Sequence, residues 1–523
     1  MRRSPARLAL LLFVLLTFAP APLAQSLDER LREIDEYAAG AGRDWNAPGF
    51  AVAIVKDDKV VFAKGYGVRE LGKPEAVDKD TLFAIASNTK AFTSAALAVL
   101  VGEGKLQWDD PVTKHLPYFQ LYDPYATREM TVRDLLSHRS GLATFGGDLL
   151  WFETTYPRDE IIRRVRHLKP AHSFRSRYGY QNIMFLAAGE IVPAVTGKSW
   201  DDFVRERFFA PLGMARTTTS HKQLLQTPNI ATPHNELRGK LRVIRYDNVD
   251  NAGGAAAINS SAAEMAQWLR LQLGRGIYEG RKIFSPPQSR EMWTPHTVVS
   301  GVSESAERFN PTVHFNLYGL GWFLGDYHGR KVVSHGGGLD GMISRTAMMP
   351  EENLGVVVLT NSETALSSVL SNKIFDTFLG VPRRDWSADY LARSKAGRAA
   401  EEAEEKRVEA SRAANTKPSL PAEAYAGAYE GPMFGAAKVA VENGKLVVRL
   451  APSPNFVGDL EHWHYDTFSV RWRDSIVYPF GRGFVTFRLS RGGKVEEMKI
   501  DVPNPDFDFK ELEFWRAPAP VER

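Results

Sequence analysis

Short, mostly apolar runs bounded by polar or turn residues occur near the start of the chain and again after residue 315. Residues 50–55 and 59–65 predict two strands joined by a polar turn. Strands at both ends of a region, with helices between them, predict an α/β (α+β) fold: an antiparallel sheet flanked by helices, plus a helical region. The helices are expected at about 90–103, 131–137, 183–196, 200–207 and 261–273, and the later strands at about 318–324, 331–335, 343–349 and 354–360.

The pattern changes after residue 382. Residues 383–420 are rich in Ala, Glu, Lys and Arg, which is typical of a solvated, charged helical linker. Residues 421–517 predict a small all-β barrel, with a hairpin over 437–449 that turns at Asn443-Gly444. We therefore expect a first domain over 25–382, a linker, a C-terminal β domain with a structural, lid or ligand-binding role, and a short tail over 518–523.

The N-terminus has the pattern of a signal peptide. Basic residues precede an apolar run from Leu8 to Phe18, and small residues follow. We predict a signal peptide over 1–24 with cleavage after Ala24; a retained anchor is the alternative. After cleavage no later segment is expected to span a membrane, so a periplasmic or secreted enzyme is predicted.

Composition narrows the function classes. The 523 residues are too many for one ordinary core, and 44% hydrophobic with 24% charged residues is typical of a globular chain. The formal net charge is +4 and no basic cluster interleaves with aromatics, which argues against nucleic acid as a partner. Cysteine is absent, so lipid attachment through cysteine and thiolate metal sites are excluded. The oligomeric state is left open.

The most informative motif is Ser87-Asn88-Thr89-Lys90, followed by an apolar, alanine-rich helical stretch. Residues three apart share a helix face, so the Lys90 amine is expected beside the Ser87 hydroxyl. Burial lowers the pKa of a lysine, and a neutral amine can accept the serine proton. Ser87 is therefore a candidate nucleophile, although many surface helices contain Ser-x-x-Lys by chance.

Two further motifs support Ser87 as the candidate nucleophile. Tyr180-Gln181-Asn182 leads into an apolar helix, and a Tyr hydroxyl near a lysine can relay a proton. His335 precedes three glycines, which on a strand edge allow a ligand to approach the backbone closely. Taken alone, each motif has an ordinary explanation: Tyr180 could be an aromatic residue at the start of a helix, and the three glycines could form a hairpin turn. All three in this order are much rarer.

With these motifs the chain resembles the serine β-lactamase and penicillin-binding-protein superfamily, in its class C β-lactamase, D,D-peptidase and esterase branch. The resemblance covers about residues 27–380. Residues 130–142, 211–215 and 253–268 contain further family-like text. The segment 459–468 resembles the small lipocalin-like domain often appended to these hydrolases.

The resemblance implies a role for each motif residue. Ser87 would be acylated, Lys90 would accept its proton, and Tyr180 would relay protons and activate the deacylating water. Asn182 would bind Lys90 and the substrate amide. Whether Lys90 or Tyr180 is the principal base stays open.

The third motif would also bind substrate. The backbone N–H groups of Ser87 and Gly338 would form the oxyanion hole, on the strand edge that includes Gly337. His335 replaces the lysine of related enzymes. A histidine is mostly neutral near pH 7, with an unperturbed pKa of about 6.5. Selection of a substrate carboxylate is then expected only at lower pH. Esters and amides without a free carboxylate therefore become more favoured as candidate substrates.

The sequence therefore predicts an exported serine hydrolase that acts on β-lactams, D-amino-acid peptides or esters, including cell-wall-derived substrates. A non-catalytic, penicillin-binding-like receptor that keeps the fold is the alternative. No cofactor and no metal are predicted. His462 and His464 lie on one strand face, but no further ligand accompanies them in the sequence.

Overall fold

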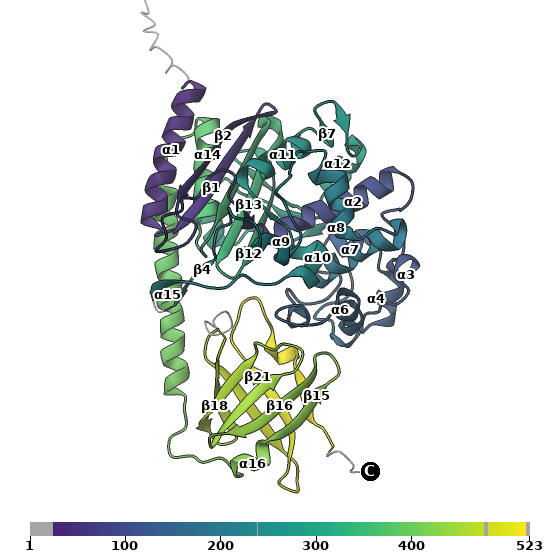
Figure 1. Cartoon of the computed structure of the whole chain (residues 1–523), viewed down its shortest axis with the longest axis vertical. Helices are drawn as coiled ribbons and strands as arrows, with labels where there is room; N and C mark the ends of the chain where they lie inside the picture. Colours follow the sequence, from purple (N-terminus) through teal and green to yellow (C-terminus); the bar gives the residue numbers. More distant parts are fainter. Residues whose placement is uncertain (1–24, 238, 475–479, 519–523) are drawn as a thin grey trace, which may run out of the picture.

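The computed structural model describes residues 25–237, 239–474 and 480–518 (Figure 1). The predicted signal peptide over 1–24 lies outside the described residues, as does most of the predicted tail. The chain folds into a larger α/β unit followed by a smaller barrel, and the long helix α15 runs between them along one side of the molecule (Figure 1).

The centre of the larger unit is an antiparallel sheet of eight strands, ordered β2-β1-β14-β13-β12-β11-β10-β9 among the described residues. Strand β1 is buried along all but its last residue, because helices cover both faces of the sheet at this point. Its strands are β1 Gly49–Lys56, β2 Lys59–Gly67, β9 Thr297–Val298, β10 Asn316–Tyr318, β11 Phe323–Tyr327, β12 Arg330–Leu339, β13 Met342–Met349 and β14 Leu354–Thr360.

Alternate residues of the central strands enter two different cores. Val52 and Ile54 of β1 pack with α1 and α14 on one face, whereas Ala51 and Ala53 join the core of the helical region on the other. The helices of eight residues or more in this unit are α1 Leu27–Asp44, α2 Thr89–Gly102, α7 Asn182–Thr196, α11 Ala262–Leu273 and α14 Leu366–Leu379. Shorter ones include α3 Val112–His115, α4 Pro124–Glu129, α5 Val132–Leu136, α6 Arg158–Arg164, α8 Trp200–Val204, α9 His221–Leu225, α10 Gly253–Ala256, α12 Pro286–Met292 and α13 Glu304–Phe309.

The C-terminal unit is a closed antiparallel barrel, which follows the short helix α16 Ala422–Tyr425. Large side chains such as Tyr429, Phe487 and Phe514 are buried in it. The predicted fold class, a helix-flanked antiparallel sheet followed by a small all-β barrel, is confirmed. The barrel strands are β15 Gly427–Gly431, β16 Gly435–Glu442, β17 Lys445–Leu450, β18 Val457–His464, β19 Thr467–Trp472, β20 Gly483–Leu489, β21 Val495–Asp501 and β22 Glu513–Arg516.

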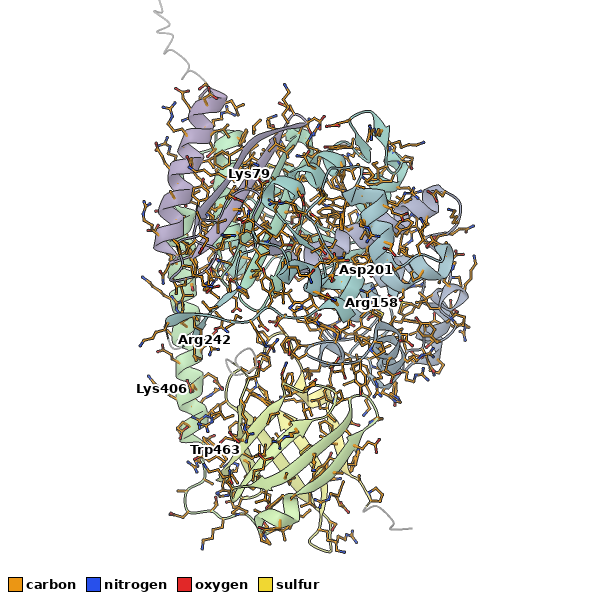
Figure 2. All side chains as sticks on the ribbon, viewed as in Figure 1. Lys79, Arg158, Asp201, Arg242, Lys406 and Trp463 are labelled. Carbon is orange, nitrogen blue, oxygen red and sulfur yellow. The ribbon has the colours of Figure 1, made fainter. Side chains whose placement is uncertain are left out.

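Helix α15, Trp386–Ala410, occupies most of the segment predicted as a charged linker. Its residues from 395 to 410 are exposed apart from one, and Lys406 points away from the molecule (Figure 2). Beyond its end, Arg412 donates a 2.9 Å hydrogen bond to the carbonyl of Trp463 on β18. Within the described ranges, no helix combines the length and the apolar character needed to cross a bilayer.

The barrel packs against the segment that follows residue 143 of the larger unit. The Phe152 ring lies 4.2 Å from that of Phe507, centroid to centroid, and the Tyr156 hydroxyl donates a 2.7 Å bond to the carbonyl of Phe434. The buried hydrophobic residues of the barrel and of the helical region form one continuous cluster, separate from the core around α1 and α14. Trp151, Phe152 and Tyr156 therefore belong to the contact between the units.

Candidate active site

Ser87 lies in a tight turn between the short strand β3 Phe83–Ala84 and helix α2. The turn is a 3-10 segment, Ala86–Asn88, and Ser87 is its only partly exposed residue. Ala86 has a φ of 47°, a left-handed conformation that costs a non-glycine residue roughly 1–2 kcal/mol. Such strain persists only where the surrounding structure holds it. The turn therefore presents the Ser87 hydroxyl in a fixed direction.

Lys90, in the first turn of α2, is fully buried beside this hydroxyl. Its Nζ lies 2.9 Å from Ser87 Oγ, 2.6 Å from Asn182 Oδ1 and 3.0 Å from the carbonyl oxygen of Ala255. The predicted proximity of Lys90 to Ser87 is present. Ala255, in α10, was not singled out as a site residue by its sequence.

Burial controls the charge of Lys90. Loss of solvation lowers the pKa of its amine to about 7, while the negative charge of Asp148 acts in the opposite direction. Burial likewise raises the pKa of the Asp148 carboxyl to about 7. Lys90 can therefore be neutral at physiological pH, which a solvated lysine cannot.

Tyr180 and Asn182 stand at the start of α7 and close the other side of Lys90. The Lys90 Nζ lies 4.8 Å from the centroid of the Tyr180 ring. Burial raises the pKa of the Tyr180 phenol, a hydrogen bond with Ser87 acts against this, and the charge of Asp148 adds to it. The phenol is thus protonated at neutral pH. The Asn182 amide is held by a 2.5 Å bond from its Nδ2 to Asp148 Oδ2.

Asp148 is the buried acid that sequence reasoning missed. It follows Gly146-Gly147 in a segment without periodicity or a recognised motif, so nothing local distinguished it from a loop carboxylate. Only the fold brings it to Asn182, 34 residues later in the chain.

The glycines after His335 allow β12 to approach the nucleophile turn. A Cβ at Gly337 would lie 2.2 Å from the Ile85 carbonyl oxygen and 3.0 Å from the Ser87 nitrogen, so only glycine fits without movement. Ser344 on β13 fixes the same turn, since its hydroxyl donates a 2.7 Å bond to the Ile85 carbonyl. The backbone of β12 is therefore held against Ser87.

One edge of β12 is open at this point. Strand β11 begins at Phe323, opposite Ser334, and among the described strands the residues of β12 from His335 onward pair with β13 alone. Gly338 is exposed on this stretch. The role of Gly338 in substrate binding stays a prediction.

His335 is buried, unlike a side chain that would bind a charged group of a substrate. Its ring is buried; Nδ1 lies 2.6 Å from the Gly336 carbonyl oxygen and Nε2 lies 2.9 Å from the Tyr318 hydroxyl. Nδ1 must carry the proton, so Nε2 accepts from Tyr318. Burial and the nearby Lys90 lower the pKa of His335 to about 3. The expected titration near pH 6.5 is therefore wrong for this environment.

Another buried histidine, His138, has a positioning contact. Its Nδ1 accepts a 3.0 Å bond from the backbone N–H of Gln181, and its ring centroid lies 4.2 Å from that of Tyr180. The structure thus shows His138 supporting the backbone between Tyr180 and Asn182. His462 and His464, the weak metal candidates, bond instead to backbone groups of Tyr465 and Ala413. The described part of the chain contains no group of three or more His, Cys, Asp or Glu arranged to hold a metal ion.

Comparison with known families agrees with this fold. The beta-lactamase family model matches residues 32–378, about two thirds of the chain, and the chain belongs to this family. A second family, described as a domain of unknown function (DUF3471), matches residues 411–516, which contain the barrel.

Individual relatives give the same picture. Unguisins hydrolase ungD' of Aspergillus campestris is 32% identical over 370 residues, covering 66% of this chain and 65% of that protein. The chain thus spans just under two thirds of this curated relative. Among solved structures, an octameric penicillin-binding protein homologue from Pyrococcus abyssi superposes with a TM-score of 0.58 at 20% identity, over 93% of this chain and 99% of that one. A D-stereospecific amidohydrolase from Streptomyces sp. gives 0.53 at 22% identity, over 67% and 99%.

Proposed function

We propose that the protein is a serine hydrolase that forms an acyl-enzyme on Ser87 and cleaves amide or ester bonds. The observation that carries the proposal is the hydrogen bonding of the buried Lys90 amine. Family membership and the hydrolase name of the 32%-identical relative support it.

With a pKa of about 7, Lys90 can be a neutral amine, and its contacts leave room for the lone pair of that form. Such an amine has two N–H donors and one lone pair. The Asn182 and Ala255 oxygens can only accept, so they take the two N–H groups. The lone pair is left for the Ser87 hydroxyl, 2.9 Å away. With a pKa of about 7, the amine has the basicity suited to accept a proton at neutral pH.

In the acylation step, Ser87 Oγ attacks the substrate carbonyl carbon and its proton passes to Lys90 Nζ. The carbonyl oxygen becomes negative and receives hydrogen bonds from the backbone N–H groups of Ser87 and Gly338. The bond to the leaving nitrogen or oxygen then breaks. Tyr180 gives its proton to that atom and regains one from the Lys90 ammonium.

Hydrolysis reverses these roles. Water attacks the acyl carbon and its proton passes through Tyr180 to Lys90. The bond from the acyl carbon to Ser87 Oγ breaks, and Oγ recovers its proton from Lys90. Since Tyr180 is a neutral phenol with a raised pKa, Lys90 is the principal base and Tyr180 the relay.

The proposed substrates are small molecules or peptides, including cell-wall-derived ones, whose scissile group is an amide or ester. His335 offers no positive charge to a substrate carboxylate, because it is buried, paired and neutral. Esters and amides without a terminal carboxylate are therefore favoured over D-alanyl-D-alanine-like acids. The N-terminal sequence supports export to the periplasm or medium.

A fluorophosphonate probe with mass analysis of the labelled peptide tests the proposal. The native protein should gain the probe mass on the peptide containing Ser87, and Ser87→Ala should gain none. Catalysis also requires turnover of an activated ester beyond one equivalent. Labelling of another residue would refute the nucleophile assignment. Stoichiometric labelling without turnover of any ester or amide would instead indicate a receptor.

A further inference from the structure

The segment 143–148, here called the 143–148 loop, is tied directly to the catalytic motif that begins at Tyr180. Four hydrogen bonds join them: Phe145 N–H to the Tyr180 carbonyl (2.8 Å), Tyr180 N–H to Thr144 Oγ1 (3.1 Å), Gln181 Nε2 to the Ala143 carbonyl (2.5 Å) and Asn182 Nδ2 to Asp148 Oδ2 (2.5 Å). A shift of this loop would therefore move Tyr180 and Asn182 together.

Glu511 is a barrel side chain that reaches this loop. Glu511 ends the 3-10 turn Phe509–Glu511, and its Oε2 accepts a 2.7 Å hydrogen bond from the backbone N–H of Gly147. Its Oε1 would lie 3.1 Å from a Cβ built at Gly146. Burial raises the pKa of Glu511 to about 7, and the Gly147 N–H acts against this shift.

The loop is closely packed at the residue that Glu511 contacts. Gly147 has a φ of 79°, and a Cβ there would lie 2.9 Å from the Ile183 side chain. Its backbone N–H points toward the barrel, and the next residue, Asp148, holds the Asn182 amide. The connection from barrel to Lys90 is therefore short: Glu511, Gly147, Asp148, Asn182 and then the amine.

We propose that Glu511 of the C-terminal barrel is a positioning residue for acyl transfer, which fixes the 143–148 loop so that Asp148 and Asn182 orient the Lys90 amine toward Ser87. The proposal rests on the proposed function and adds the barrel to the catalytic unit. Glu511 acts through other residues and is assigned no contact with substrate. A displacement of about 1 Å at a catalytic group can lower the rate about a hundredfold.

The same face of the barrel provides a matched control. Glu513 pairs with Lys169 at 3.0 Å, across the contact between the units, but both side chains are largely exposed. Exposed ion pairs contribute little to stability. Glu513→Ala thus removes an inter-unit carboxylate two residues from Glu511 without touching the 143–148 loop.

The test measures the limiting rate of Ser87 acylation by a fluorophosphonate in the full chain, together with the concentration giving half of that rate and the Tm. We expect Glu511→Ala and Glu511→Asp to lower the limiting rate by about ten- to a hundredfold, with little change in half-saturation. Glu511→Gln should stay close to native, because its amide oxygen can accept the same N–H. Glu513→Ala should match native.

Equal rates in Glu511→Asp and Glu513→Ala would overturn the proposal, as would a rate that falls only in step with Tm across all variants. If Glu511→Ala does not fold, the comparison of Asp with Gln at this position decides. A native chain that is never acylated at Ser87 would instead refute the proposed function itself.

Discussion

The Lys90 amine lies 2.9 Å from the Ser87 hydroxyl oxygen, and its other two contacts are oxygens that can only accept. When the amine is neutral, this arrangement leaves its lone pair for the serine proton. We therefore expect the rate of Ser87 acylation to rise with pH through about 7, as Lys90 loses its proton, and to level off above it. Stopped-flow acylation between about pH 5.5 and 9 measures this. A flat profile would contradict Lys90 as the base.

Lys90→Arg should abolish acylation, because it places a permanent cation where a neutral base is needed. An arginine is protonated at all accessible pH values and cannot accept a proton. Loss of one member of such a catalytic unit costs several powers of ten in rate. Combining Lys90→Arg with Tyr180→Phe should add little to the loss. Multiplicative losses in the double variant would show that the two residues act independently.

Asp148→Asn should shift the pH profile rather than remove activity. The Asp148 charge raises the pKa of Lys90, so a neutral amide at this position lets that pKa fall further. The acid limb of the acylation profile should then move below pH 7. An asparagine oxygen can still accept the Asn182 hydrogen bond. A profile that moves to higher pH, or stays in place, would contradict electrostatic coupling between Asp148 and Lys90.

Gly337→Ala should displace the nucleophile turn. The new Cβ would lie 2.2 Å from the Ile85 carbonyl oxygen, which is backbone and cannot rotate away. We expect a loss of about 1–3 kcal/mol of stability and a fall in acylation rate of about 10²–10³. Gly336→Ala is the control, since its nearest contact would be 3.7 Å. Similar effects of both substitutions would remove the steric explanation.

Selection between a matched acid and methyl ester should not depend on the protonation of His335. With a pKa of about 3, the ring stays neutral from about pH 5 to 8, far from its unperturbed titration. The ratio of kcat/KM for the two substrates should be constant over that interval. The titration of Lys90 affects both substrates and cancels. A ratio that changes with a single titration near pH 6.5 would contradict this. It would mean that a solvent-exposed His335 contacts the substrate carboxylate.

The catalytic motifs were accessible to sequence reasoning because their geometry is local. Ser87 and Lys90 are one helical turn apart, and Tyr180 stands immediately before the helix that starts at Asn182. The fold class was also predictable from the short apolar strand runs at both ends of the first region, with helical stretches between them. Val52 and Ile54 face one core and their neighbours face the other, which explains why this run is apolar throughout.

The remaining site residues depend on contacts between distant segments. Asp148 and Glu511 are 363 residues apart in sequence, and neither belongs to a motif. The Ala255 carbonyl contributes only backbone, which any residue type could supply. His335 is neutral near pH 7 as expected, but its titration near pH 6.5 was wrongly expected, because its burial against Tyr318 is a tertiary property. Contacts between such distant segments cannot be predicted from a local pattern in the sequence.

The Phe152–Phe507 contact is also expected to affect how long activity is retained on heating. Phe152 lies four residues after Asp148, in the segment against which the barrel packs. Separation of the two units would expose these rings to water and loosen the chain beside the buried acid Asp148. Heat inactivation is then expected to begin with separation of the two units, before the central sheet unfolds. The half-life of activity at high temperature would then measure how stably the barrel packs against the larger unit.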